Sequence, residues 1–184
     1  MSKAIDIEIV VDTVTLLGKY SNPSQDSKNP TGIAHNGYAY MIAQAAYVQN
    51  DASGKATQAT GDLIISALVN DTIRWRMLSL SGNADYSAVV YDIQWFSGEH
   101  VTSEPTQDVI SQPYVPLPIL VKGQQTQPPT FSAVTANDYF LQVNVTGHGS
   151  EGYKVFFYVT TQDPVTGKPV LKGYYYWDPT IKAA

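Results

Sequence analysis

The sequence predicts an all-β protein, a single-domain antiparallel β-sandwich of jelly-roll or immunoglobulin-like type with minimal helix. Three observations support this class. Apolar and polar residues alternate with a period of two in most segments. These segments, about eight in number, are short and are separated by turns rich in Gly, Asn and Asp. At 184 residues the chain has the size of one domain with one sizeable core.

The N-terminal segment shows the alternation clearly. One face of the expected strand carries apolar residues only, at Ile5, Ile7, Ile9 and Val11. The other face carries Asp6 and Glu8, which is typical of a strand that buries one side. A short helical turn is expected at about residues 13–20, with Asp12 as N-cap and Gly18 near its end.

Strand-like residues continue at 38–48, and residues 60–96 read as three further strands with turns at 70–71 and 81–85. In the second of the three, Ile73, Trp75 and Met77 share a face. In the third, one face is expected to carry Val89, Tyr91, Ile93 and Trp95. Core packing is the simplest role for Trp75 and Trp95.

The alternation stops at about residues 104–130, where six prolines occur. Proline cannot donate to a strand ladder, so we expect an excursion across the surface, extended or in short edge pieces. Both flanks read as strands of one sheet system, so residues 1–184 are expected to form one domain.

Three strands are expected after this excursion, at residues 138–147, 152–161 and 169–179. The turn between the first two, "GHGSEG" at 147–152, matches the glycine pattern of a dinucleotide site. That site requires a helix after the glycines, whereas a strand follows here. The glycines are better explained by a hairpin loop.

Composition and charge exclude several classes of function. The net charge is −5 and the 11 Lys and Arg residues are scattered, so no basic footprint for nucleic acid exists. There is no cysteine, hence no disulfide or thiolate nucleophile. Asp6 and Glu8 interrupt the N-terminal apolar run, unlike a signal peptide, and no stretch reaches about 18 apolar residues. We expect a soluble cytoplasmic protein without membrane association.

No catalytic motif stands out. The three histidines show no metal-ligand spacing, the G-x-S-x-G nucleophile motif does not occur, and the 16 Asp and Glu residues offer no distinguishable pair. We therefore expect no enzyme activity, no catalytic residue, no metal site and no cofactor.

The segment "NPSQDSKNPTGIAH" at residues 22–35 is a polar loop with two X-Pro steps. Its side-chain oxygens either bond nearby backbone and cap a sheet end, or bind a ligand such as a sugar or a hard cation like calcium. The EF-hand spacing is absent. We predict that Asp26 and Asn29 bond loop backbone, and we name as binding candidates Asn22, Asp26, Asn29 and His35.

A second group of binding candidates lies near the C-terminus, at Tyr176, Trp177 and Asp178. Aromatic rings beside carboxylates suit sugars, which stack their apolar faces on rings. The alternative for Trp177 is a core position that anchors the last strand.

Several strings together resemble the AidA/PixA family of bacterial inclusion body proteins: residues 10–13, 20–36, 71–76, 90–99 and 173–181. The Asn-Pro-Ser-x-Asp string of the loop and the closing Tyr-x-Trp-Asp-Pro are the more specific parts. The resemblance implies a bacterial protein regulated by quorum sensing or phase variation. In some members it also implies packing into cytoplasmic crystalline inclusions. Some inclusion-forming members are methionine-rich, whereas this chain has 3 Met.

Low charge, 13 tyrosines and edge-capable strands favour a non-catalytic, self-associating protein, a homodimer or larger homo-oligomer. The alternative is a lectin-like carbohydrate-binding module whose glycan site lies on end loops, an argument from fold analogy.

Overall fold

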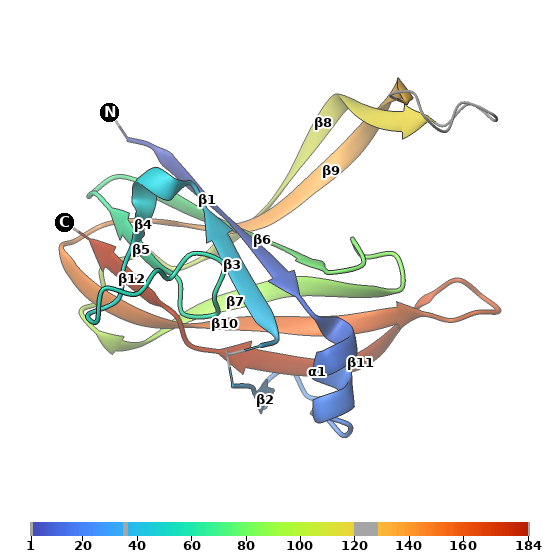
Figure 1. Ribbon diagram of the computed structural model, residues 1–184, viewed down its shortest axis with the longest axis horizontal. Coiled ribbons are helices and arrows are strands. Elements are labelled where there is room, and N and C mark those ends of the chain that lie inside the picture. Colours follow the sequence, from blue (N-terminus) through green and yellow to red (C-terminus); the bar gives the residue numbers. More distant parts are fainter. Residues whose placement is uncertain (1, 35–36, 120–128, 184) are drawn as a thin grey trace. The chain divides into compact units, whose positions relative to one another are not determined.

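The computed structural model describes residues 2–34, 37–119 and 129–183 (Figure 1). Two short helices lie among these residues, α1 (Thr13–Lys19) and the 3₁₀ turn η1 (Ala45–Tyr47). The strands are, in order, β1 (Ala4–Val11), β2 (Thr31–Gly32), β3 (Ala39–Ala43), β4 (Val48–Gln49), β5 (Ile64–Ala67), β6 (Thr72–Ser79), β7 (Tyr86–Gly98), β8 (Thr106–Ile119), β9 (Thr130–Asn144), β10 (Gly149–Gln162), β11 (Pro169–Trp177) and β12 (Thr180–Ala183). The chain is all-β with minimal helix, as the alternation predicted.

The strands form two sheets. One has the order β3-β1-β6-β9-β8, and the other has the order β2-β11-β10-β12-β5-β4 with β7 also paired to β10. This confirms the sandwich-like class. Three pairs are parallel, namely β1–β6, β2–β11 and β5–β12, and these depart from the purely antiparallel arrangement that we expected. Between β1 and β6 the chain passes through β4 and β5 of the other sheet, so it returns beside β1 in the same direction.

The two sheets bury their inner faces against each other. All four apolar residues predicted for the inner face of β1 are fully buried. Across the core, the indole Nε1 of Trp75 on β6 donates to the hydroxyl of Tyr153 on β10 at 3.3 Å, and the two ring centres lie 5.6 Å apart. A polar contact between two large buried rings thus joins one sheet to the other.

Strand β10 has neighbours on both sides for most of its length (Figure 1). On one side it pairs with β7; on the other it pairs first with β12 and then with β11. Its side chains alternate, so Tyr153, Val155 and Phe157 are buried in the core while Lys154 and Tyr158 are partly exposed. This strand therefore presents a second, outward face that differs from the core.

Two register shifts interrupt the pairing of β7 with β10, and they correct the predicted face of β7. Val90 and Asp92 oppose consecutive residues of β10, so Tyr91 is the extra residue of a bulge. A bulge reverses the alternation that follows it. Ile93 is consequently buried opposite Val155, while Val89 and Tyr91 lie on the other face of β7. Trp95 follows Ile93 on the same face, but it is 47% exposed and stacks on His100, so the prediction that Trp95 packs in the core was wrong.

The helix prediction is confirmed. Asp12 accepts hydrogen bonds from the backbone N–H of Thr15 at 3.1 Å and from its hydroxyl at 2.7 Å, as an N-cap does. The "GHGSEG" string differs from the prediction because its last four residues, Gly149 to Gly152, already belong to β10. None of the described helices is long and apolar enough to cross a membrane.

The proline-rich segment forms a 14-residue strand, β8, at the end of its sheet. The edge position was predicted, whereas one long strand in place of short pieces was not. Residues 1–107 with 140–184 form one compact unit, and residues 108–139 form a second. The second unit contains most of β8 and the first part of β9, and we call it the arm.

Two buried tyrosines make a matched test of the inter-sheet contact. Tyr153→Phe leaves the Trp75 N–H without its acceptor and should lower the free energy of unfolding by about 1–3 kcal/mol. Among the described residues the hydroxyl of buried Tyr175 has no hydrogen-bond partner, so Tyr175→Phe should be neutral or slightly stabilising. Urea unfolding of both variants checks this. Equal losses of unfolding free energy in the two variants would contradict a stabilising role for the Trp75–Tyr153 hydrogen bond.

Candidate functional site

The outward face of the second sheet carries a cluster of five aromatic rings. They come from three adjacent strands and are Tyr91 on β7, Phe156 and Tyr158 on β10, and Tyr174 and Tyr176 on β11. Strand register brings them together, because Phe156 lies opposite Tyr176 and Tyr158 lies opposite Tyr174. We call this cluster the aromatic face.

The loop at residues 22–34 lies against this face and is fixed to it along its length. Pro23 packs so closely on Gly173 that a Cβ at Gly173 would overlap its ring. The Ser24 carbonyl accepts from the Tyr174 amide at 2.9 Å, and the Ser27 carbonyl accepts from the Tyr91 hydroxyl at 2.9 Å. Each anchor joins the loop to a strand that contributes to the aromatic face.

The Tyr91 hydroxyl is held in its protonated, hydrogen-bond-donating form. Partial burial and then the negative charge of neighbouring Asp92 raise the pKa of Tyr91 to about 12. Its bond to the loop therefore persists at every pH near neutrality.

Within the loop, Asp26 organises a turn. One carboxylate oxygen accepts from the Lys28 amide at 2.9 Å and the other from the Asn29 side-chain amide at 2.8 Å. These bonds, the Lys28 amide first, hold the pKa of Asp26 below its ordinary value. Asp26 bonds loop backbone as predicted; Asn29 bonds the Asp26 carboxylate in place of backbone.

A cavity of about 560 Å³ opens between the loop and the aromatic face, and we call it the loop cavity. The loop side is residues 27–30. The sheet side consists of Tyr91, Asp92, Gln94, Lys154, Phe156 and Tyr176. The Lys154 ammonium lies 4.9 Å from the Tyr176 ring centre, a cation–π distance.

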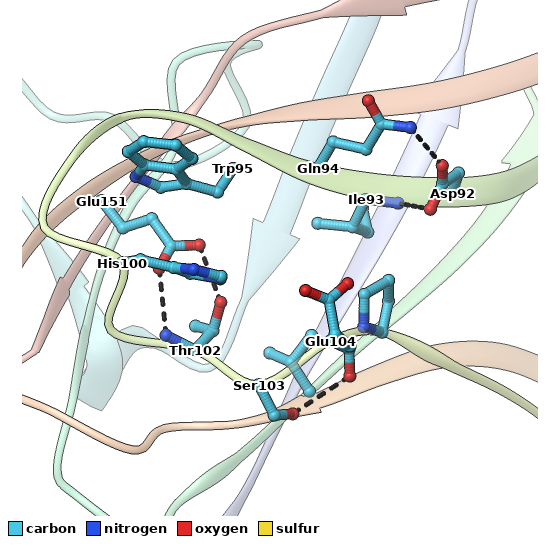
Figure 2. A pocket seen from close by; sticks show the side chains of 11 residues that line it. Asp92, Ile93, Gln94, Trp95, His100, Thr102, Ser103, Glu104 and Glu151 are labelled. Carbon is cyan, nitrogen blue, oxygen red and sulfur yellow. Dashed lines mark hydrogen bonds between the residues drawn. The ribbon is translucent and has the colours of Figure 1, made fainter. Parts of the chain in front are cut away.

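A second cavity, of about 300 Å³, lies beside the first and shares Asp92 and Gln94 with it (Figure 2). Trp95 and His100 stack at one side, with ring centres 5.6 Å apart and planes 20° apart. The Asp92 carboxylate accepts from the Gln94 amide at 2.6 Å, which fixes both side chains between the two cavities.

Glu151 lines the second cavity but is almost fully buried. Its carboxylate accepts three hydrogen bonds, from the Val101 amide at 2.7 Å, the Thr102 amide at 3.0 Å and the Thr102 hydroxyl at 2.7 Å. Figure 2 shows the two bonds from Thr102. These three hydrogen bonds give Glu151 the role of fixing residues 101 and 102 to β10.

The predicted binding candidates divide between these places. Asn29 and Tyr176 line the loop cavity. Asn22 is exposed at the start of the loop, and Asp26 is engaged in its turn. Trp177 is buried and donates from Nε1 to the Gly61 carbonyl at 3.0 Å, the core alternative, while Asp178 is exposed beyond it. His35 lies outside the described residues.

Sequence reasoning missed most of the sheet side of the loop cavity, namely Tyr91, Asp92, Gln94, Lys154 and Phe156. A signal for Lys154 was present, since it stands between apolar residues of an alternating strand and must face outward. Across the described residues, no group of three or more His, Asp or Glu side chains is arranged to hold a metal ion.

Two facing sheets, an outer aromatic face and a loop fixed over it define a β-sandwich-like protein with a preformed surface cavity. Comparison with known families matches residues 3–183 to the family described as PixA, inclusion body protein. The chain belongs to this family. No curated protein matches the chain in sequence.

A solved structure supports the fold. The crystal structure of an inclusion body protein (PixA) from Burkholderia cenocepacia is similar over 100% of this chain and 96% of that chain. The TM-score is 0.75 at 23% sequence identity. At this identity the likeness concerns the fold alone.

Asp26→Ala tests the structural role of the loop turn. The variant should lower the melting temperature at pH 7 by about 2–4 °C, the scale of one modest interaction in a chain of this size. Because the folded-state pKa of Asp26 is lowered, its contribution is complete above the unfolded value near 3.8 and is lost as pH falls through the folded-state value. The difference from wild type should therefore shrink in strong acid.

Asp85→Ala is the matched control, because the Asp85 carboxylate is exposed and makes no hydrogen bond with the described residues. Differential scanning calorimetry between pH 2 and 7 compares the two variants. A melting temperature equal to wild type for Asp26→Ala would contradict the structural role.

Glu151→Ala should lower the stability of the fold much more than Asp26→Ala does. Three donors lose their acceptor in a buried place, so we expect a loss on the order of 3 kcal/mol or more. The control is Glu99→Ala, whose exposed carboxylate accepts one backbone bond from Ser150 at 3.1 Å. Chemical unfolding measures both, and similar losses would contradict the role given to Glu151.

Proposed function

We propose that the chain is a non-catalytic, self-associating protein, and that copies associate through the arm. Membership of the inclusion body protein family supports association as the function. The single observation that carries the proposal is the number of apolar side chains that the arm exposes: Val109, Ile110, Tyr114, Leu117, Ile119 and Phe131. Exposed apolar groups that gather on one small element are typical of interaction surfaces.

The arm also carries little charge to oppose association. Among its described residues, 108–119 and 129–139, only Asp108 and Asp138 are charged, and the Asp138 carboxylate accepts from Gln112 at 3.2 Å. Because the surface has few charges, the burial of apolar side chains is the main contribution to the free energy of association when two such surfaces meet.

Tyr114 is the most exposed aromatic residue of the arm, at 81%, and its backbone has a positive φ of 65°. A non-glycine residue in this region costs on the order of 1 kcal/mol or more. The conformation directs a large, amphipathic ring outward from an edge strand, as interface anchors are placed.

Prolines decide how the arm associates. Pro113, Pro116 and Pro118 lie in β8, and none of them has an N–H to offer to an added strand. Edge strands that carry proline are protected against strand addition. We therefore propose that copies meet by side-chain packing and not by extending the sheet.

The proposal that the protein is not an enzyme is supported by the hydrogen bonds and pKa values of its carboxylates. Local hydrogen bonds lower the pKa of Asp26, Asp51, Glu99 and Asp163, which is the opposite of the raised pKa that a general acid needs. The buried Glu151 is saturated by backbone and hydroxyl donors. These groups serve the fold.

The family resemblance adds two further parts to the proposal, a cytoplasmic location and regulation by quorum sensing or phase variation. Cell fractionation and transcript measurement across growth test these parts independently of the arm.

The test of association uses a triple substitution in the arm, Tyr114→Asn with Leu117→Ser and Phe131→Ser. Asn is chosen because it tolerates a positive φ. Light scattering at tens of micromolar should give a dimer or larger for wild type and a monomer for the variant. A weakening of association of at least about tenfold is expected when three apolar groups are lost.

The matched control replaces equally exposed apolar residues of the larger unit, Val14→Ser with Leu80→Ser and Val165→Ser. This variant should associate as wild type does. Monomeric wild type, or unchanged association of the arm variant, would refute the proposal.

A further inference from the structure

We propose that the loop cavity binds a pyranose sugar and prefers sugars that carry a carboxylate. This goes beyond self-association and uses a different part of the chain. The loop cavity lies in the compact unit of residues 1–107 and 140–184, whereas the arm is the other unit.

The floor of the loop cavity is formed by two aromatic side chains, of which Tyr176 is the more exposed. Phe156 and Tyr176 are cross-strand neighbours whose rings lie 5.6 Å apart and nearly parallel, at 24°. An aromatic ring face carries negative charge density, which attracts polarised C–H groups. A pyranose presents such C–H groups on one face, so it can pack against the exposed part of the Tyr176 ring, beside the largely buried Phe156.

The rim of the cavity suits hydroxyl groups. Asp92 keeps free lone pairs beyond its bonds to Gln94 and the Ile93 amide, and the Asn29 side-chain oxygen is an acceptor not used by the turn. The Lys154 ammonium supplies donors. A sugar hydroxyl donates and accepts at once, so acceptors and donors placed around an aromatic floor match a ring that carries several hydroxyls.

The same rim discriminates against a phosphate group. A phosphate group carries a charge of about −1.5 to −2, so it exceeds the single positive charge in excess at the cavity and is repelled more strongly by the Asp92 carboxylate than a sugar with one carboxylate. Lys28 and Lys154 exceed Asp92 by one positive charge among the lining residues. A single carboxylate on the sugar would balance this excess while its hydroxyls use Asp92 and Asn29.

The cavity has the size of a small-molecule site and is already formed. Its volume of about 560 Å³ lies within the range of about 300–1,000 Å³ that such sites occupy. The bonds from Tyr91 and Tyr174 to the loop fix its upper wall. Gly32 leaves room for the floor, because a Cβ there would lie 3.1 Å from the Tyr176 hydroxyl and the ring would have to shift by a few tenths of an ångström.

The test begins with a glycan array that carries neutral and acid-terminated glycans, probed with full-length protein in calcium and in EDTA. We expect binding in both buffers, strongest to acid-terminated glycans. Calorimetric titration with methyl glucuronide and methyl glucoside then compares two pyranoses that differ in the carboxylate.

Four variants assign the binding to the loop cavity. Tyr176→Ala should weaken binding of both sugars by at least about tenfold, since the stacking surface is lost. Tyr86→Ala removes a half-exposed tyrosine elsewhere on β7 and should bind as wild type. Lys154→Gln should weaken glucuronide binding several-fold and glucoside binding less, while Lys168→Gln makes the same change in net charge at an exposed turn without this effect.

Melting temperatures of all four variants separate loss of the site from loss of the fold. Absence of glycan binding by wild type would overturn the proposal. So would equal effects of Lys154→Gln and Lys168→Gln, or displacement of the sugar by inorganic phosphate at equal concentration, which would indicate a simple anion site. The monomeric arm variant should still bind sugar, so failure of either proposal can be distinguished from failure of the other.

Discussion

The pairing of β10 on both sides is the constraint on which the rest of the structure depends. With β7 along one edge and β12 then β11 along the other, β10 cannot slip by one residue without exposing Tyr153 and Phe157 to solvent. The same register sets which residues face outward. One pattern of alternation thus fixes the core contact with Trp75 and the outer aromatic face together.

Two irregularities in the pairing of β7 with β10 change which side chains of β7 face outward. The bulge at Tyr91 directs its ring outward, next to Phe156, and lets Ile93 return to the core. The second register shift makes Phe96 the extra residue, and Trp95 directly before it is exposed and lines the second cavity. Bulges next to binding regions commonly redirect side chains in this way. The cavities therefore lie where the ladder is irregular.

The sequence pattern correctly predicted those elements that depend on interactions between residues close together in the chain. The inner face of β1 and the Asp12 cap follow from residues one to four apart, and both are present. The shared face predicted for β7 was wrong because a bulge depends on register with a strand some 60 residues away in sequence. The parallel pairs were missed for the same reason, since strand order is a property of the whole fold. Of the loop cavity, sequence indicated Asn29 and Tyr176, while the residues from β7 and β10 required knowledge of pairing.

The hydrogen bond from Tyr91 to the Ser27 carbonyl has a consequence for the kind of recognition that the loop can perform. Because the pKa of the Tyr91 hydroxyl is raised to about 12, this bond between loop and sheet is kept at every pH near neutrality. The conformational entropy of residues 22–34 is then lost when the chain folds, and little is left to lose when a molecule enters. If the loop cavity binds a sugar as proposed, a loop fixed in this way makes it a rigid receptor that selects by shape.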